Sequence, residues 1–297
     1  MINYIVLLIL IVIVASRLNN HENFTSGNSI ISFPNEHDVM TALLKSNYLR
    51  GFNHSDMAAR GLTNGVLDHY MNNIDCNPVG EHRYTLKNMV EKIYVELKPG
   101  DKKQFIMSPW KFTLFNGLEN NFPHTHHDII FLPFGLINST QNNRITLVHE
   151  KVHVFQKQSP EIFDDLYENY WHFKKISGEF LTKLPFDTRS NPDTLDNNWL
   201  FTYGGANIVM LVRYADKGSG SRGDITDVEY IGYDIATGTS RKLTEIPQVM
   251  DFFGNNKGTN YYHPYEISAD MISYHCYGDV RPSKAYDQMK QWWNKID

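Results

Sequence analysis

The chain opens with an apolar segment that differs from everything after it. Residues 2–15 are almost entirely apolar, and the segment ends at Ser16 and Arg17. This length is short for a membrane span, which needs about 20 residues, but it suits the apolar part of a signal peptide. We therefore expect residues 1–16 to be a signal peptide or signal anchor, and the protein to be secreted or membrane-anchored. A buried N-terminal strand or helix is the alternative.

The next segment, residues 17–36, is polar and rich in Asn, which is typical of a linker. From residue 37 onwards, apolar side chains first recur every three or four positions, as they do on the buried face of an amphipathic helix. On this basis helices are predicted at residues 38–49, 55–59 and 85–97. We expect one folded domain over residues 37–297.

Shorter apolar runs then predict a small sheet, a long helical stretch and a strand-rich region. Strands are expected at residues 104–107, 111–115 and 129–133, and helices at 144–157 and 161–182. Three later strands, separated by Gly-rich turns, are expected at residues 199–203, 208–214 and 228–234. Two closing helices are expected at residues 266–277 and 283–295. Helices and strands segregated along the chain in this way predict an α+β fold, with residues 190–250 as a β-rich insertion.

Composition narrows the function only a little. A chain of 297 residues with 41% hydrophobic residues can bury a substantial core. The net charge of −5 argues against a broad nucleic-acid interface, which needs a basic face. Cys76 and Cys276 form either one disulfide or two buried thiols. Three Asn-X-Ser/Thr sequons, at Asn23, Asn53 and Asn138, are consistent with a glycoprotein.

The strongest chemical signal is an HExxH motif, His149-Glu150-Lys151-Val152-His153, inside a predicted helix. Four residues advance an α-helix by about 400°, so the two imidazoles project from nearly the same side, one turn apart. This spacing lets two nitrogens reach one zinc ion. Glu150 is rotated by about 100° from His149, so it can flank the metal as a general base.

A catalytic zinc usually has a third protein ligand. The metzincin continuation needs Gly and His where the chain has Gln156 and Ser159, so that pattern is not met. The best candidate is Glu266, which stands one helical turn before Asp270 on a predicted helix. Glu266 could bind the metal, and Asp270 could accept the free N–H of a ligand histidine.

HExxH followed by a later Glu-x-x-x-Asp resembles the thermolysin-like zinc peptidases, or gluzincins. The resemblance implies a zincin-like domain with one zinc ion per chain, held by His149, His153 and Glu266. It also implies that Glu150 is the base and that Asp270 stands behind a histidine. The resemblance covers only these two motifs. Gluzincins place the Glu much closer to the second His, whereas here the separation is 266 − 153 = 113 residues, so the strand-rich stretch would be an insertion.

Other third ligands remain open. Glu179 lies at a spacing from the motif that is more common in that family, but Lys183 stands one turn later, where the pattern has an acid. Glu168 and His172 form another pair one turn apart on a predicted helix.

Two features before the motif could serve the metal or the substrate. By resemblance, the strand that precedes the active helix lines the cleft and pairs with the substrate backbone, and this strand comprises Ile129, Ile130, Phe131, Leu132 and Pro133. The histidines just before it could be outer groups of the site, a second metal site or a polar loop; they are His124, His126 and His127.

Hydrolysis of an amide also needs a donor that stabilises the oxyanion, often His or Tyr. His263 is favoured by its position three residues before Glu266. The sequence does not choose between it and several tyrosines, namely Tyr203, Tyr230, Tyr261, Tyr262 and Tyr265.

These observations predict a zinc-dependent peptidase that acts on a peptide or protein substrate, binds no nucleic acid and could associate with a membrane through its N-terminal segment. Hydrolysis of a non-peptide amide, or a non-catalytic zinc-binding role at a surface or envelope, are the alternatives. An intact Glu150 argues against the second alternative, because a structural metal site has no use for a general base.

Overall fold

The structure of the protein is a computed structural model. It describes residues 29–46, 48–63, 65–138, 143–194, 199–215, 224–254, 262–279 and 282–296. The chain divides into two compact units, residues 1–30 and residues 31–297. The folded unit thus begins at Ile31, inside the stretch expected to be a linker.

Within the described part of the chain, no helix is both long enough and apolar enough to cross a membrane. The expectation of membrane anchoring through residues 2–15 is therefore not supported. Those residues themselves lie outside the described part, because nothing before residue 29 belongs to it.

The first part of the folded unit is mainly helical. Its helices are α2 (Glu36–Lys45), α3 (His54–Ala59), α4 (Val66–Asn72) and α5 (Gly80–Glu96). Three of these helices match the predicted ones, and α4 was not predicted. Asn53 begins α3 with a capping box: its side chain accepts a hydrogen bond from the Asp56 N–H, and the Asp56 carboxylate accepts one from the Asn53 N–H. The Asn53 amide also donates to the Thr188 carbonyl at 2.7 Å, so this sequon residue is engaged in the fold.

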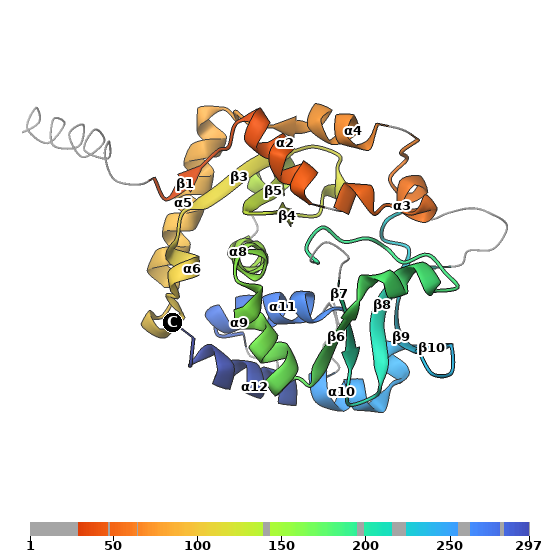
Figure 1. The fold of residues 1–297 in the computed structure, drawn as a ribbon. Coiled ribbons are helices and arrows are strands. Elements are labelled where there is room, and N and C mark those ends of the chain that lie inside the picture. Colours follow the sequence, from red (N-terminus) through yellow and green to blue (C-terminus); the bar gives the residue numbers. More distant parts are fainter. Residues whose placement is uncertain are drawn as a thin grey trace, which may run out of the picture. The chain divides into compact units, whose positions relative to one another are not determined.

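A five-stranded sheet follows (Figure 1). It contains β1 (Ile31–Ser32), β2 (Ile74–Asp75), β3 (Trp110–Phe115), β4 (His124–His126) and β5 (Ile129–Pro133). The order is β1-β3-β5-β4, with β2 also paired to β3. β1, β3 and β5 run parallel, whereas β4 is antiparallel to β5 and forms the edge.

Residues 104–107, expected as a strand, form the short helix α6 (Gln104–Met107). Four residues are too few for periodicity to separate helix from strand. Packing decides the conformation, because Phe105 stacks on Phe155 with ring centroids 4.1 Å apart. A second short helix, α7 (Phe134–Ile137), follows β5.

The central helix is α8 (Arg144–Gln158), as the sequence predicts, and α9 (Pro160–Asp165) and a π-helical turn (Leu166–Tyr170) come next. The expected helix over residues 161–182 is wrong beyond this turn. His172 has a positive φ of 60°, which ends the helical stretch. The next residues form β6 (Phe173–Ser177), since they pair with a later strand instead.

The second sheet is an antiparallel arrangement in the order β10-β9-β8-β7-β6. Its other strands are β7 (Trp199–Tyr203), β8 (Ile208–Tyr214), β9 (Val228–Asp234) and β10 (Thr239–Lys242). The three strands expected in this region are confirmed. The sheet begins at Phe173, earlier than the insertion expected at residues 190–250, because β6 joins it.

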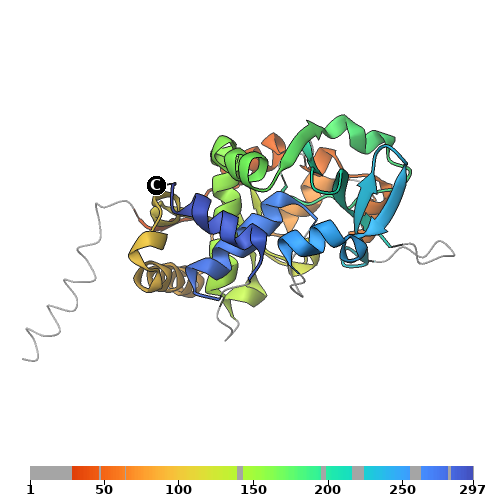
Figure 2. The same cartoon turned by 90° about the horizontal axis from the view of Figure 1, so that it is seen from below.

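The chain closes with α10 (Pro247–Phe253), α11 (Pro264–Cys276) and α12 (Lys284–Trp293). Figures 1 and 2 show α11 and α12 on the side of α8 that faces away from the first sheet, with the second sheet beside them. The fold is therefore α+β, as expected. Cys76 and Cys276 are both free thiols.

Candidate metal centre

Two helices supply the residues of the two motifs. α8 carries His149 and His153 one turn apart, and α11 brings Glu266 against them. One ligand atom from each of these three side chains lies within 4.8 Å of the others. Among the described residues, no other group of three or more His, Cys, Asp or Glu side chains is close enough to hold a metal ion.

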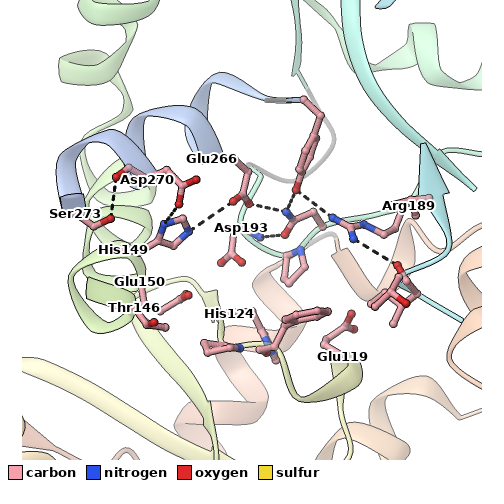
Figure 3. A pocket seen from close by; sticks show the side chains of 18 of the residues that line it. Glu119, His124, Thr146, His149, Glu150, Arg189, Asp193, Glu266, Asp270 and Ser273 are labelled. Carbon is pink, nitrogen blue, oxygen red and sulfur yellow. Dashed lines mark hydrogen bonds and ion pairs between the residues drawn. The ribbon is translucent and has the colours of Figure 1, made fainter. Parts of the chain in front are cut away.

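The hydrogen bonds of His149 fix which of its nitrogens faces the other ligands. Its Nδ1 lies 3.1 Å from the Asp270 carboxylate, which can only accept when ionised (Figure 3). Nδ1 must therefore carry the proton. The Nε2 atom lies 3.6 Å from Glu266 Oε2.

Gln156 fixes in the same way which nitrogen of His153 faces the other ligands. Its Oε1 lies 2.7 Å from His153 Nδ1, and its Nε2 donates to the Tyr265 carbonyl at 2.9 Å and to the Ser268 hydroxyl at 2.9 Å. A carbonyl only accepts, so the amide end of Gln156 must point at Tyr265 and its oxygen at His153. The Nδ1 of His153 is therefore also a donor, and its Nε2 carries a lone pair.

Three lone-pair atoms consequently face one another. The two Nε2 atoms are 3.0 Å apart, and His153 Nε2 lies 3.8 Å from Glu266 Oε2. Such an arrangement is stable only with a cation among the atoms, either a proton or a metal ion. Two ligands at ~2.0–2.1 Å from one tetrahedral ion would lie roughly 3.3–3.4 Å apart, so the observed triangle needs only small adjustments to hold one.

The electrostatics of the cluster agree with this need for positive charge. Burial alone would lower the pKa of His149, but hydrogen bonds with Asp270 and Glu266 raise it well above its ordinary value. Burial would raise the pKa of Glu266, but His153 and His149 hold it well below its ordinary value. The carboxylate of Glu266 is thus ionised beside the two imidazoles.

Glu150 stands beside the cluster. Its side chain is 3% exposed, and its Oε2 atom has no hydrogen-bond partner in the described structure. Burial, followed by the nearby charge of Asp193, raises the pKa of the Glu150 carboxyl well above its ordinary value. A carboxyl with a free oxygen and a raised pKa is suited to accept and return a proton.

A cavity of about 360 Å³ opens over these residues. His149, Glu150 and Glu266 form one wall, and Arg189 lies on the opposite side of the pocket in Figure 3. A volume of this size is typical of a site for a small molecule or a short peptide. Asn191, two residues after Arg189, donates to Glu266 Oε1 at 2.6 Å and so links the two walls.

The segment 187–191 that carries Arg189 is held from both sides. On one side, the Arg189 N–H donates to the Val212 carbonyl of β8 at 3.0 Å. On the other side, the buried carboxylate of Asp56 in α3 accepts from the N–H and the hydroxyl of Ser190, at 3.0 and 2.8 Å. Asp56 is in turn paired with Arg60 at 3.1 Å, which is also paired with Glu119 at 2.9 Å.

The structure does not place the expected substrate strand at the cavity. β5 (Ile129–Pro133) lies between β3 and β4, and none of its residues is among those that line the cavity. The edge strand is β4, because the chain turns back after it and pairs it antiparallel to β5. His124, at the start of β4, does line the cavity.

β4 is not free to pair with a substrate. The N–H of Thr125, at its centre, donates to the Asp193 carboxylate at 2.7 Å, and the Thr125 carbonyl accepts from Lys157 at 2.6 Å. The edge strand is therefore occupied at this point by the protein's own side chains.

The histidines before β5 are not a polar loop. His124 and His126 are buried, at 1% and 0% exposure, whereas His127 lies exposed at the turn with a φ of 55°. Burial lowers the pKa of His126 well below its ordinary value, and the neighbouring His124 adds to this effect. They are not part of the metal-holding group.

His263 does not line the cavity either. It begins α11, where its Nδ1 accepts from the Tyr265 N–H at 3.2 Å, and burial lowers its pKa to about 3. The cavity instead contains Tyr230 and Tyr262, whose rings stack at 5.6 Å. Of the other expected tyrosines, Tyr203 and Tyr265 do not line it, and Tyr261 lies outside the described residues.

The competing third ligands lie elsewhere. Glu179 is exposed, in a 3-10 helix (Gly178–Lys183) that follows β6. Glu168 is in the π-helical turn, and His172 follows it with an exposed side chain. None of the three lines the cavity.

Two residues of the site escaped sequence reasoning. Gln156 was considered only as a departure from the metzincin pattern, and its position three residues after His153 was the available signal. Arg189 has no local motif, since tertiary contacts alone bring it to the cavity.

Comparison of the chain with protein-family models, with curated proteins and with solved structures finds no match.

Proposed function

We propose that the protein is a zinc-dependent peptidase of the gluzincin type, with a zincin-like catalytic domain. His149, His153 and Glu266 would hold the ion, with Asp270 and Gln156 orienting the two imidazoles. The observation that carries the proposal is the convergence of one ligand atom from each of these three side chains, all within 4.8 Å of one another, with the Nδ1 atoms of both imidazoles turned outward to Asp270 and Gln156. Two imidazoles and one carboxylate are a donor set used by catalytic zinc sites.

A zinc ion supplies Lewis-acid chemistry, since it polarises a carbonyl group and makes water acidic enough to lose a proton near neutral pH. Glu150, whose carboxyl oxygen Oε2 has no hydrogen-bond partner in the described structure, would serve as the general base and would return the proton to the leaving amine. The protein wall around Glu150 keeps its carboxyl largely out of contact with bulk water. Peptides are the proposed substrate class because this ligand set with a glutamate base is used mainly by peptidases.

Metal content tests the ligand set. The full chain should bind about one zinc ion, and Glu266→Ala should weaken zinc binding by more than about 100-fold, because it removes a ligand rather than a group behind one. Glu179→Ala is the matched control and should leave zinc binding unchanged. A wild-type protein that binds no zinc after metal loading would contradict the proposal.

Cleavage of a mixed peptide library tests the activity. Glu150→Gln should keep its zinc and lose about 100-fold or more of the cleavage rate, which is the usual size of a general-base contribution. A zinc-loaded wild-type protein that cleaves no peptide would point instead to a non-peptide amide or to a non-catalytic role.

A further inference from the structure

The charged groups that line the cavity include one cation, Arg189, which stacks over the Tyr262 ring but is in no ion pair within the described part of the chain. Five carboxylates line the cavity, and four are neighbours of cationic or proton-bearing groups. These four are Glu119 beside Arg60, Asp193 beside Lys157, and Glu266 and Asp270 beside the imidazoles of the metal centre. The fifth, Glu150, has a pKa raised by burial.

Arg189 is the only Lys or Arg among the described residues that line the cavity. In the described part of the chain it forms no ion pair. Its guanidinium makes two long hydrogen bonds, to the Ile225 carbonyl and to the Tyr262 hydroxyl, each at 3.4 Å. A guanidinium has five N–H donors in a fixed fork, so most of its capacity to bind an anion remains unused.

The guanidinium is held at a fixed place relative to the metal centre. The backbone of Arg189 is tied to β8, and the hydroxyl of Tyr262 contacts both Arg189 and the Asn191 amide. That amide donates to Glu266 Oε1. Three hydrogen bonds thus separate Arg189 from a metal-binding carboxylate, and a single ligand inside the cavity can reach both.

The occupied centre of the edge strand gives such an anchor a purpose. A substrate cannot pair with the centre of β4 while Asp193 and Lys157 hold the Thr125 backbone. Binding energy and orientation must then come from other polar groups in the cavity. A pair of charge-assisted hydrogen bonds from a guanidinium to a carboxylate supplies both binding energy and orientation.

We propose that Arg189 binds a carboxylate of the substrate and makes the site selective for peptides with a negatively charged group close to the scissile bond. This inference rests on the proposed peptidase function. The carboxylate can come from the free C-terminus of a peptide or from an Asp or Glu side chain.

A set of four labelled hexapeptides separates these sources. The peptides carry either Glu or Gln at one fixed position near the centre, and either a free or an amidated C-terminus. A zinc-loaded wild type should prefer one carboxylate source over its neutral counterpart by about 10- to 100-fold in kcat/KM, which is the range for a hydrogen bond to a charged group. The arm that shows the preference identifies the source.

Arg189→Gln should reduce this preference to near unity. Arg213→Gln is the matched control: this arginine lies in β8, with its backbone bridged to Thr188, but its side chain pairs with Glu229 at 2.7 Å and does not line the cavity, so the preference should persist. Equal rates for all four peptides with the wild type, or an unchanged preference in Arg189→Gln, would overturn the inference.

A binding measurement keeps this test independent of catalysis. The four fluorescent peptides are titrated by anisotropy into zinc-loaded Glu150→Gln protein, with and without Arg189→Gln. Tighter binding of the carboxylate peptides, lost in the double variant, supports the role of Arg189 even where the wild type cleaves no peptide. Equal affinities for all four peptides refute that role, whatever the activity.

Discussion

The two walls of the cavity are built in different ways. One wall, called the metal-holding wall because it carries the three proposed metal ligands, comes from two regular helices, and each motif places its side chains by helical spacing alone. The opposite wall is the irregular segment 187–191, whose position depends on hydrogen bonds to α3 and β8. In the first wall the spacing within each motif is therefore set locally, and only the packing of α11 on α8 is long-range. In the second wall no local pattern places the side chains, which depend on contacts 23 residues away in β8 and 134 residues away in α3.

The difference also concerns how charge is held. The metal-holding wall gathers acceptors that need a cation, while the opposite wall rests on a buried pair network in which charges already compensate one another. In that network Arg60 is paired with both Asp56 and Glu119, and the side chains of all three are nearly inaccessible. Each wall should consequently respond to a different kind of substitution.

The largest expected effect comes from Arg60→Met. It leaves two carboxylates buried without their cation, so the free energy of unfolding should fall by about 3–5 kcal/mol. Urea denaturation measures the loss. Arg213→Met is the matched control: its pair with Glu229 is about one-third exposed, and exposed pairs contribute only about 0–1 kcal/mol.

The zinc content of folded Arg60→Met protein tests whether the two walls of the cavity are independent. If the two walls are independent, folded Arg60→Met protein should still bind one zinc ion. Loss of zinc from protein that remains folded would show that the buried pair network also supports the metal-holding wall.

A smaller effect is expected from Gln156→Met, which acts on the other wall. Methionine has a similar length but cannot accept the His153 N–H, so zinc affinity should fall by about 10- to 100-fold. Competition with a chelating dye measures the affinity. Gln158→Met, on the exposed side of the same helix, should leave it unchanged, and an equal loss in both variants would contradict the role assigned to Gln156.

The smallest effect concerns pH. Because burial depresses the pKa of His126 in the folded state, the unfolded chain binds its proton first as the pH falls below about 6.5. The contribution to stability is therefore complete above that pH and is lost during acidification, by up to about 1.4 kcal/mol per pH unit. Unfolding measured at pH 7, 6 and 5 should show this loss.

His126→Phe should reduce that dependence, since it keeps an aromatic ring and removes one of the titrating groups; His124 and His263, whose pKa values are also lowered by burial, retain part of it. His126 packs between Tyr48 and Phe131, which a phenyl ring can also contact. A variant with the same pH dependence as the wild type would show that His126 does not titrate differently in the two states.

The sequence predicts the elements with strong periodicity and fails where tertiary contacts decide. The helix around His149 and the strands β7, β8 and β9 are confirmed, because their patterns are long and regular. The change from helix to strand after His172 was not predictable, since it depends on a positive φ and on pairing with residues 22 to 30 positions later in the chain.

The site divides in the same way. The spacing of the motifs indicates which residues could hold a metal, and the structure brings those residues together. The order of strands in the first sheet could not be read from the chain, so the expected substrate strand is internal and β4 is the edge. The position of Arg189 in the cavity and the hydrogen bonds that occupy the Thr125 backbone depend on tertiary contacts, so no local sequence pattern predicts them.

The distance along the chain between the two ligand helices has a consequence for synthesis. A ribosome adds about 5–20 residues per second, so roughly 6–23 s pass between His153 and Glu266, which are 266 − 153 = 113 residues apart. During this interval the nascent chain holds only two of the three proposed ligands. A chain that terminates early, anywhere before α11, therefore cannot complete the centre, and uptake of metal would coincide with the last stage of folding.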